Sequence, residues 1–462
     1  MLTKDKAQSI FARVLKFSSA DETELLISGG RSALTRFANN AITQNVAEEN
    51  YTLSVRVNVN GRTARATTNK FDDESIRRVV EAATNLAKVQ APDPDLLPMA
   101  DASAFDGKGP APARNFFETS TMGPQERADA VEKIVQVAHK QKLTTAGIYS
   151  TSESVDAILN SSGLVAYYTQ TSAECSITML APDSSGWQKA NSPDARNFDP
   201  VQLAEIAAQK AKASAGPQDL APGKYTVILE PAAVLDLLGF IFWDWGGQAI
   251  LDERSFLNNR VGTKLFGENI SISDDVYHPL QSGAPFDGEG VRRQRVLLVE
   301  KGVVSNLVYA RGTAEKVRKS EFADKVGPVR ATGHGFPIPN EIGEMPMNIV
   351  LYSGVAGKSR TVDEMIGGTD EGILVTRLWY IREVDPYEKI LTGMTRDGTF
   401  LVKDGQIRGG IRNFRFNQSM VALLNNVLEM GEPVRASGEE SFDMVVPAMK
   451  IRDFNFTEVT KF

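Results

Sequence analysis

The alternation of apolar and polar positions predicts a chain that mixes helices with β-hairpins. Residues 4–17 carry apolar side chains at helical spacing, and residues 23–28 have the composition of a short strand. The next alternation has a period of two and runs into Asn60-Gly61, a dipeptide that tolerates positive φ and closes two-residue hairpins. Residues 62–68 are then the returning strand of this hairpin.

A helix is predicted directly after the hairpin. Asp72 and Asp73 are of the residue type that caps a helix N-terminus, and the apolar residues beyond them recur at helical spacing. The side chains expected to face the core are Ile76, Val79, Val80, Ala83 and Leu86. The charged residues between them are expected to form a solvated face.

Two connectors divide the chain into three segments. Residues 91–113 contain several prolines and few large apolar side chains, which is the composition of an extended linker. Residues 215–223 form a second connector rich in proline and glycine. Between the connectors we expect a helix over residues 124–142, two strands separated by a Ser-Ser-Gly turn, and a helix over residues 200–213.

The segment after the second connector is expected to be mostly β. Residues 225–230 read as a strand, and residues 232–249 as a strongly apolar helix. Turn dipeptides at Lys301-Gly302 and Asp404-Gly405 predict two further hairpins. Residues 418–429 are predicted to form the last helix.

Together these elements predict an α+β fold. We expect an N-terminal segment over residues 1–90 and a central segment over residues 115–215 that packs with it, both mixing hairpins with helices. We expect the C-terminal domain, over residues 222–462, to consist mostly of antiparallel strands around the buried apolar helix.

Composition narrows the class of protein. The 462 residues are 42% hydrophobic and 24% charged, with no apolar stretch of membrane-spanning length, so we expect a soluble globular protein without a membrane partner. No signal peptide is visible and the chain has one cysteine, which is compatible with the cytoplasm. The net charge of −7 disfavours nucleic acid as a partner.

No complete catalytic site is recognisable from the residues. A catalytic zinc usually takes three ligands from His, Cys and carboxylates, but the three histidines are too scattered to share a helix face. His334 stands between two glycines on a predicted loop, and loops often carry function. Cys175 alternates with apolar residues and is interpreted as a buried small side chain rather than a nucleophile.

Other polar clusters have structural interpretations. Asp287 and Glu289 could bind a hard cation or act as acid and base, but their spacing is not that of a calcium loop. The basic group Arg292, Arg293 and Arg295 is interpreted as a solvated strand face.

Several segments, in chain order, resemble the TldD/PmbA family. The sequence Phe-Ala-Asn-Asn-Ala-Ile over residues 37–42 is similar to the N-terminal signature of that family. Pro-Phe-Asp-Gly-Glu-Gly-Val over residues 285–291, followed by residues 296–302, is similar to the C-terminal one. Residues 372–379 and 397–407 continue the resemblance, which covers the chain from about Thr23 to Ile451.

The resemblance implies a pair of related proteins, TldD and TldE (PmbA), that assemble into a zinc metallopeptidase acting on flexible peptides and modified-peptide precursors. In the TldD half, a helix at the start of the C-terminal domain carries a His-Glu-x-x-x-His motif, and a cysteine near the C-terminus completes the zinc site. Here the matching helix, Pro231 to Phe242, has no histidine, and Ser437 stands in place of the cysteine. Both departures are typical of the TldE half, because serine and aliphatic side chains are poor zinc ligands.

The resemblance therefore implies a non-catalytic subunit that shapes a substrate chamber. Zinc is expected in a TldD-like partner and no cofactor in this chain. An extended peptide substrate could add to a free strand edge. No catalytic or metal-ligating residue is assigned. The candidate substrate or partner contacts are Asn39, Asn40, Asp287, His334 and Trp379.

Two alternatives stay open, and with them the question of whether the chain is itself an enzyme. One is a regulatory or binding protein without a peptidase role, as the family's description as a modulator of DNA gyrase suggests. The other is a self-associating homologue with an activity of its own, for which His334 and the carboxylates near Asp287 would be the first candidates.

Overall fold

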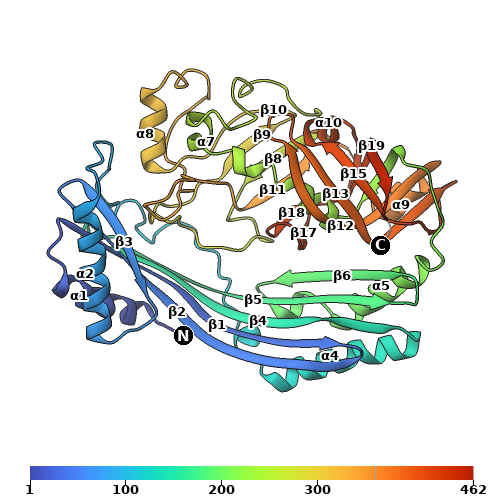
Figure 1. Cartoon of the computed structure of the whole chain (residues 1–462), viewed down its shortest axis with the longest axis horizontal. Helices are drawn as coiled ribbons and strands as arrows, with labels where there is room; N and C mark the ends of the chain where they lie inside the picture. The colour runs from blue at the N-terminus through green and yellow to red at the C-terminus, as the bar shows by residue number, and fades with distance from the viewer. Residues whose placement is uncertain (358, 461–462) are drawn as a thin grey trace.

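The computed structural model of the chain describes residues 1–357 and 359–460. Its architecture is α+β, with three sheets whose neighbouring strands are mostly antiparallel, which confirms the predicted fold class. One sheet, built from the N-terminal half, lies along the lower part of the view, and the C-terminal domain lies above it (Figure 1).

The N-terminal sheet joins strands from the first two predicted segments. It has the strand order β3-β2-β1-β4-β5-β6. Its strands are β1 (Glu22–Ala38), β2 (Ala41–Val59), β3 (Arg62–Thr68), β4 (Thr144–Asn160), β5 (Val165–Leu180) and β6 (Ser185–Ser192). The β2–β3 hairpin turns at Asn60 and Gly61 with φ of 50° and 70°, as the dipeptide predicted.

β1 is much longer than the short strand predicted for residues 23–28. At residues 29–32 the strand passes through two glycines and two exposed polar residues, so the composition there does not continue the strand pattern. It persists because it is hydrogen-bonded to β2 on one side and β4 on the other. Gly29 and Gly30 adopt positive φ, and a Cβ on Gly30 would lie 1.9 Å from the backbone oxygen of Glu153.

Four long helices cover the face of this sheet that points away from the C-terminal domain. α1 (Lys4–Phe17) and α2 (Asp73–Val89) pack on one end of the sheet, and α4 (Pro124–Gln141) and α5 (Pro200–Ala213) on the other. The short elements α3 (Phe117–Ser120) and η1 (Ala195–Asn197) lie between them in the chain. No helix within the described ranges is long and apolar enough to cross a membrane.

The helix predicted after Asp72 is present as α2, and the Asp72 carboxylate accepts the backbone N–H of Ser75. Its predicted inward stripe is right except at Leu86, which is 46% exposed. Thr84 and Ala87 are buried instead, so the inward face of the helix is rotated relative to the predicted one.

The C-terminal domain contains a six-stranded sheet, β10-β9-β8-β11-β18-β17, and a seven-stranded sheet that includes β12, β7, β19, β15, β13 and β14. The strands of the first sheet are β8 (Ile270–Asp274), β9 (Val296–Glu300), β10 (Val303–Val304), β11 (Ile349–Ser353), β17 (Val434–Ala436) and β18 (Met444–Val446). Those of the second are β7 (Gly223–Leu229), β12 (Glu371–Asp385), β13 (Ile390–Lys403), β14 (Gln406–Gly410), β15 (Phe414–Ser419), β16 (Val427–Met430) and β19 (Met449–Val459). The helices of this domain are α6 (Pro231–Leu238), η2 (Phe242–Asp244), α7 (Gly247–Leu251), α8 (Arg311–Lys319), α9 (Val362–Gly367) and α10 (Met420–Asn425).

The apolar helix predicted over residues 232–249 is not continuous. It divides into α6, η2 and α7, with the chain turning between them. Asp244 in the middle forms a buried ion pair with Lys389, and Gly247 lies against the ring of Tyr309, where a Cβ would lie 2.5 Å from a ring carbon. These contacts with distant segments stabilise the broken form over a straight helix.

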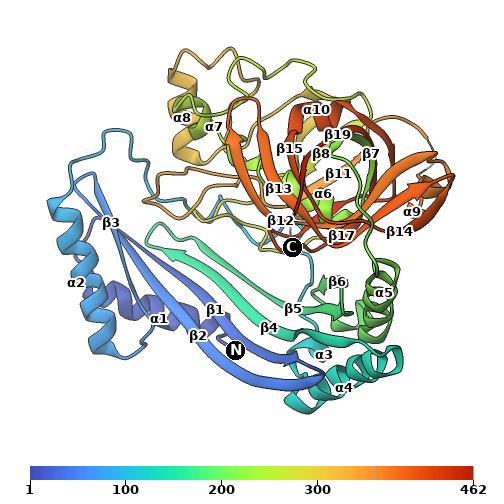
Figure 2. The same cartoon turned by 45° about the vertical axis from the view of Figure 1, so that its right-hand side comes forward.

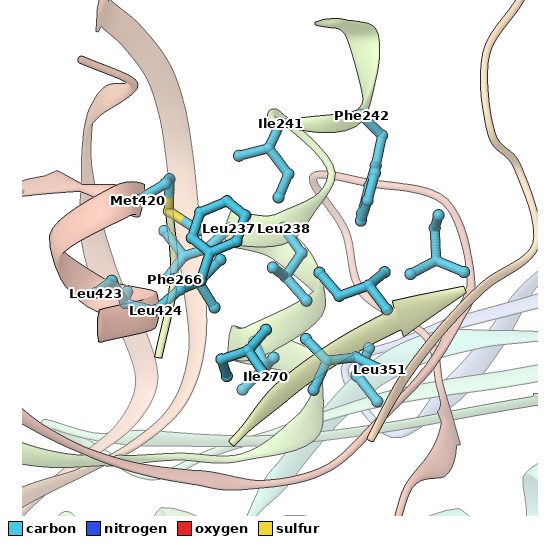
Figure 3. Packing of buried hydrophobic residues seen from close by; sticks show 14 of the residues in the cluster. Leu237, Leu238, Ile241, Phe242, Phe266, Ile270, Leu351, Met420, Leu423 and Leu424 are labelled. Carbon is cyan, nitrogen blue, oxygen red and sulfur yellow. The ribbon is translucent and has the colours of Figure 1, made fainter. Parts of the chain in front are cut away.

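α6 is the buried helix of the domain. Leu237 and Leu238 are 1% exposed and point into an apolar cluster that includes side chains of β8, β11 and α10 (Figure 3). The last predicted helix is shorter than expected, because after α10 the chain continues as strand β16, which pairs with β19.

Candidate functional site

A cavity of about 500 Å³ lies between the N-terminal sheet and the loops of the C-terminal domain. Its floor is formed by β1, β4 and β5, and its roof by residues 281–293, 334–348 and 442–443. Two of the five candidate contact residues, Asp287 and His334, line this cavity. Because ligand sites are usually concave, apolar and furnished with a few polar groups, this cavity is the candidate functional site.

The floor carries an acidic side chain in its centre. Asp156 on β4 pairs with Ser28 of β1 and Tyr168 of β5, so these three side chains share the face that points to the C-terminal domain. Among the described residues, the Asp156 carboxylate has neither a hydrogen-bond donor nor a salt-bridge partner. Burial raises its pKa, and the charge of Arg293 opposes that rise.

Arg293 descends from the roof toward the same cavity. Its Nη1 lies 3.4 Å from Asn348 Oδ1, a long hydrogen bond, and no carboxylate of the described chain is within salt-bridge distance of its guanidinium. The earlier interpretation of the basic group around residues 292–295 as a solvated strand face is therefore wrong for Arg293. Arg295 is solvated, with a side chain that is 63% exposed, but it precedes β9 and does not lie on a strand face.

His334 forms a buried pair with Asp274 in the roof. His334 Nε2 lies 3.0 Å from Asp274 Oδ1, and both side chains are inaccessible to solvent. The second oxygen of Asp274 accepts the backbone N–H groups of Met347 and Asn348. Burial alone would raise the pKa of Asp274, but the charge and hydrogen bond of His334 lower it below its ordinary value. The pair holds the roof loop in place.

Asp287 organises the loop beside it. Its carboxylate accepts three backbone N–H groups, from Glu289, Val291 and Gly335, at 2.7 to 2.9 Å. Burial raises the pKa of both Asp287 and Glu289, and the negative charge of Asp287 raises the pKa of Glu289 further. All three acceptor contacts join backbone segments, so Asp287 is a structural residue of the cavity wall.

A third buried acid, Glu344, supports the same region. Its two oxygens accept the backbone N–H groups of Gln248 and Ala310 at 2.8 and 3.0 Å. Burial raises the pKa of Glu344 to about 7. The acid thus ties the start of α7 to the start of α8.

The remaining candidates lie outside the cavity. Asn39 and Asn40 form the β1–β2 turn with φ of 51° and 62°, and the Asn40 amide bonds to the backbone of Leu143 and Thr145. Trp379 is on β12, where the guanidinium groups of Arg377 and Arg396 stack on its ring at 5.5 and 4.8 Å. The fold therefore does not bring these three residues to Asp287 and His334.

Asp156 and Arg293 are the cavity residues that sequence reasoning missed. Asp156 is one polar residue in an alternating strand, a pattern that fits a solvated face as well as a binding site. Arg293 gave a signal as part of a basic group, but its direction depends on a loop that is pinned by Asp274 and Asp287.

The two segments that the resemblance places around zinc are adjacent in this structure. Asp236 on α6 accepts the backbone N–H groups of Glu439 and Glu440 at 3.2 and 3.1 Å, just beyond Ser437. The second oxygen of Asp236 and the hydroxyl of Ser437 are buried and have no hydrogen-bond partner in the part of the chain that the structure describes. Burial raises the pKa of Asp236 to about 7.

These residues do not fit a zinc ion. A protein zinc site uses three or four ligands from thiolate, imidazole and carboxylate, whereas α6 offers one carboxyl group, that of Asp236, and the later segment has the hydroxyl of Ser437 in place of a thiolate. Within the described ranges no group of three or more His, Cys, Asp or Glu side chains is arranged to hold a metal ion.

Comparisons with known proteins cover nearly the whole chain. Family models of the PmbA/TldA metallopeptidase match as domain 1 over residues 23–87, the central domain over 117–215 and the C-terminal domain over 222–458. Metalloprotease PmbA of Escherichia coli O157:H7 is 22% identical over 86% of this chain and 85% of its own length. A metalloprotease PmbA homolog of Haemophilus influenzae is 24% identical over the same shares.

Solved structures share the fold. TldE from Thermococcus kodakarensis superposes with a TM-score of 0.83 at 21% identity, covering 98% of this chain and 99% of that one. A putative modulator of a DNA gyrase from Thermotoga maritima gives a TM-score of 0.82 at 18% identity, covering 98% of this chain and 100% of that one.

Proposed function

This chain belongs to the PmbA/TldD metallopeptidase family, and from that premise we propose that it is the non-catalytic, TldE-like subunit of a two-chain zinc metallopeptidase. In this role it shapes the chamber in which a TldD-like partner cleaves flexible peptides or modified-peptide precursors. The observation that carries the proposal is the replacement of zinc ligands by apolar packing on α6 and by Ser437.

The packing of α6 supports this assignment. Its side chains belong to the main hydrophobic core, and those of Leu237, Leu238 and the following Ile241 and Phe242 are at most 1% exposed. A metal-ligating helix must present imidazole groups to an open coordination position. Apart from Asp236, the buried side chains of α6 are apolar and pack against other apolar groups, which stabilises the domain and leaves hydrolysis to the partner.

A free strand edge supports the binding of an extended peptide. Residues 41–52 of β2 pair with β1 on one side, whereas β3 begins to pair with β2 only at Leu53. No other described strand covers the open side, and β2 forms the outer rim of the sheet (Figure 2). Backbone groups on such an edge bind an added strand with little dependence on its side chains.

The division of labour follows from these groups. The partner supplies the zinc ion, which would polarise the scissile carbonyl and activate water. This chain supplies main-chain donors and acceptors along β2 and a cavity between its N-terminal sheet and its C-terminal loops. These groups hold a flexible peptide in an extended form, which lowers the entropy cost of reaching the reactive geometry.

The test is reconstitution with purified components. The chain alone, a TldD-like partner alone and their mixture are incubated with an unstructured peptide, and cleavage is followed by mass spectrometry. We expect cleavage in the mixture, its loss on chelation, and no stoichiometric zinc in the isolated chain by elemental analysis. Chelator-sensitive cleavage by the isolated chain would contradict the proposal.

A second candidate function is regulation of DNA gyrase without peptide cleavage. It is favoured by the description of the Thermotoga maritima protein of similar fold as a putative gyrase modulator. Its direct test is pull-down of purified gyrase by this chain in the absence of a TldD-like partner. The net charge of −7 argues against a mode that depends on direct DNA contact.

A further inference from the structure

We propose that the cavity between the N-terminal sheet and the C-terminal loops binds a small zwitterion, namely an unblocked amino acid or very short peptide with an apolar side chain. Asp156 receives its ammonium group and Arg293 its carboxylate. A free amino acid and a short peptide both carry an ammonium group at one end and a carboxylate at the other. The experiment below distinguishes them by the size of the ligand.

The ammonium site rests on the lack of a partner for Asp156. Its carboxylate rises from the centre of the sheet beside Ser28 and Tyr168, with no donor among the described residues. The Tyr168 hydroxyl is already used, because it donates to the backbone oxygen of Pro112. A partly buried carboxylate without a donor is costly, and a ligand ammonium with its three N–H groups would satisfy it.

The carboxylate site rests on the unused donors of Arg293. One guanidinium nitrogen has the long contact with Asn348, so most of its five N–H donors have no protein acceptor in the described chain. The nearby acids do not compete for them, since Asp287 accepts three backbone N–H groups and Asp274 is paired with His334. A planar guanidinium with free donors binds a carboxylate in a bidentate manner.

The fold keeps the two charged groups apart. Asp156 is fixed in the middle of a sheet, and Arg293 is fixed on a loop whose backbone N–H donates to Pro285 and whose carbonyl accepts the Tyr277 hydroxyl. They line one cavity but are not within salt-bridge distance of each other. A ligand with opposite charges at its two ends fits between them, whereas a singly charged ligand would leave one group unpaired.

The walls determine the side chain that the ligand can carry. Phe286, Phe336 and Phe442 line the cavity together with Ile158 of the floor and Met347 of the roof. These groups contact an aliphatic or aromatic side chain favourably and offer nothing to a second charge. At about 500 Å³ the cavity is in the range of small-ligand sites, which agrees with a ligand of one to three residues.

This inference rests on the proposed function only for the origin of the ligand. If the chain lines a peptidase chamber, such zwitterions are the products of exhaustive cleavage or the free end of a substrate. The binding site itself is built from residues of this chain, so it can be tested without a partner.

The first experiment varies the ligand and uses the full chain. L-leucyl-L-phenylalanine and L-phenylalanine are titrated by isothermal calorimetry, each beside its N-acetyl and its C-terminal amide form. We expect blocking of either end to weaken binding about tenfold or more, because each removes a charge-assisted contact. Tighter binding of the dipeptide than of the amino acid identifies a peptide end as the source, and the reverse order identifies a free amino acid. Equal binding of blocked and unblocked forms, or no binding of any form, overturns the proposal.

The second experiment assigns each end to its residue. Asp156→Asn should remove the preference for a free N-terminus and keep that for a free C-terminus, and Arg293→Gln should do the reverse. The matched control is Arg295→Gln, because Arg295 lies two residues from Arg293 and is exposed, where it pairs with Asp275. This variant should change neither preference. Variants that shift both preferences together contradict the assignment. If neither the amino acid nor the dipeptide binds, but peptide cleavage with the partner is intact, the zwitterion site is overturned and the proposed function stands.

Discussion

The carboxyl oxygen Oδ1 of Asp236 lies 3.1 Å from the backbone nitrogen of Glu440. This hydrogen bond joins α6 to the segment after Ser437, the two parts of the chain between which the resemblance places zinc. Gly438 permits the approach, because a Cβ there would lie 2.2 Å from the same oxygen. A carboxyl group and two backbone N–H groups therefore bridge the segments that a metal ion would bridge in the catalytic half.

Asp236→Ala is expected to destabilise the protein by roughly 3 kcal/mol, since it removes a fully buried side chain and with it the acceptor of the N–H groups of Glu439 and Glu440. The free energy is measured by urea denaturation followed by circular dichroism. The control is Asp219→Ala, whose carboxylate is 82% exposed and pairs with Arg412, and it should change stability by less than about 0.5 kcal/mol. Equal effects of the two variants would show that the bridge contributes nothing.

Leu238→Ala is expected to cost about 2–5 kcal/mol, because Leu238 is 1% exposed and packs in the core around α6 (Figure 3). Leu428→Ala on β16 is the control, since Leu428 is 48% exposed and its truncation leaves no cavity. Thermal unfolding of both variants measures the difference. A melting temperature of the Leu238 variant near that of the control would mean that α6 is not a core helix.

The His334 and Asp274 side chains are predicted to be coupled. His334→Ala leaves a buried carboxylate oxygen without its partner and should cost roughly 3 kcal/mol. A double-mutant cycle with Asp274→Asn should then give a coupling energy of about 1 kcal/mol or more. If the effects of the two single substitutions on the free energy of unfolding are additive, the side chains are not coupled. If His334→Ala keeps its stability but loses a chemical activity, His334 has a functional role instead.

Stability should fall as pH rises from about 4 to 7, the interval between the unfolded-state and folded-state pKa values of two buried acids. The pKa values of Glu344 and Asp236 are raised to about 7 in the folded protein, so the folded state holds more protons than the unfolded state in this window. Each such group lowers the free energy of unfolding by up to about 1.4 kcal/mol per pH unit. The lowered pKa of Asp274 does not interfere, because its contribution is lost only in more acidic solution.

Glu344→Gln should flatten this pH dependence by about one proton, even if it lowers stability at every pH. The exposed Glu321 provides the control, and Glu321→Gln should leave the slope unchanged. Melting temperatures across the pH range measure both slopes. An unchanged slope in the Glu344 variant would show that Glu344 is ionised throughout.

Local chemistry was sufficient for the elements that depend on neighbouring residues. The turn at Asn60-Gly61, the cap at Asp72 and the helix over residues 200–213 are set by interactions within a few positions of the chain. The missing zinc ligands at α6 and Ser437 are likewise visible in the amino-acid types alone, and the structure added how closely the two segments approach.

Tertiary contacts decided the features for which no local signal exists. Strand β1 continues through Gly29 and Gly30 because it pairs with β2 on one side and, on the other, with β4, which is more than 100 residues away in the chain. The apolar stretch after residue 231 is divided into separate helices by two tertiary contacts. Asp244 pairs with Lys389, and Gly247 packs against Tyr309.

The sequence by itself thus determined the fold class, most of the elements and the absence of a recognisable metal motif, because these follow from residue types and short spacings. Only the tertiary structure decided that Asp156 and Arg293 face one cavity while Asn39, Asn40 and Trp379 lie elsewhere. The reason is physical. Which charged side chains are left without a partner depends on the packing of strands and loops far apart in the chain, and no local pattern encodes that.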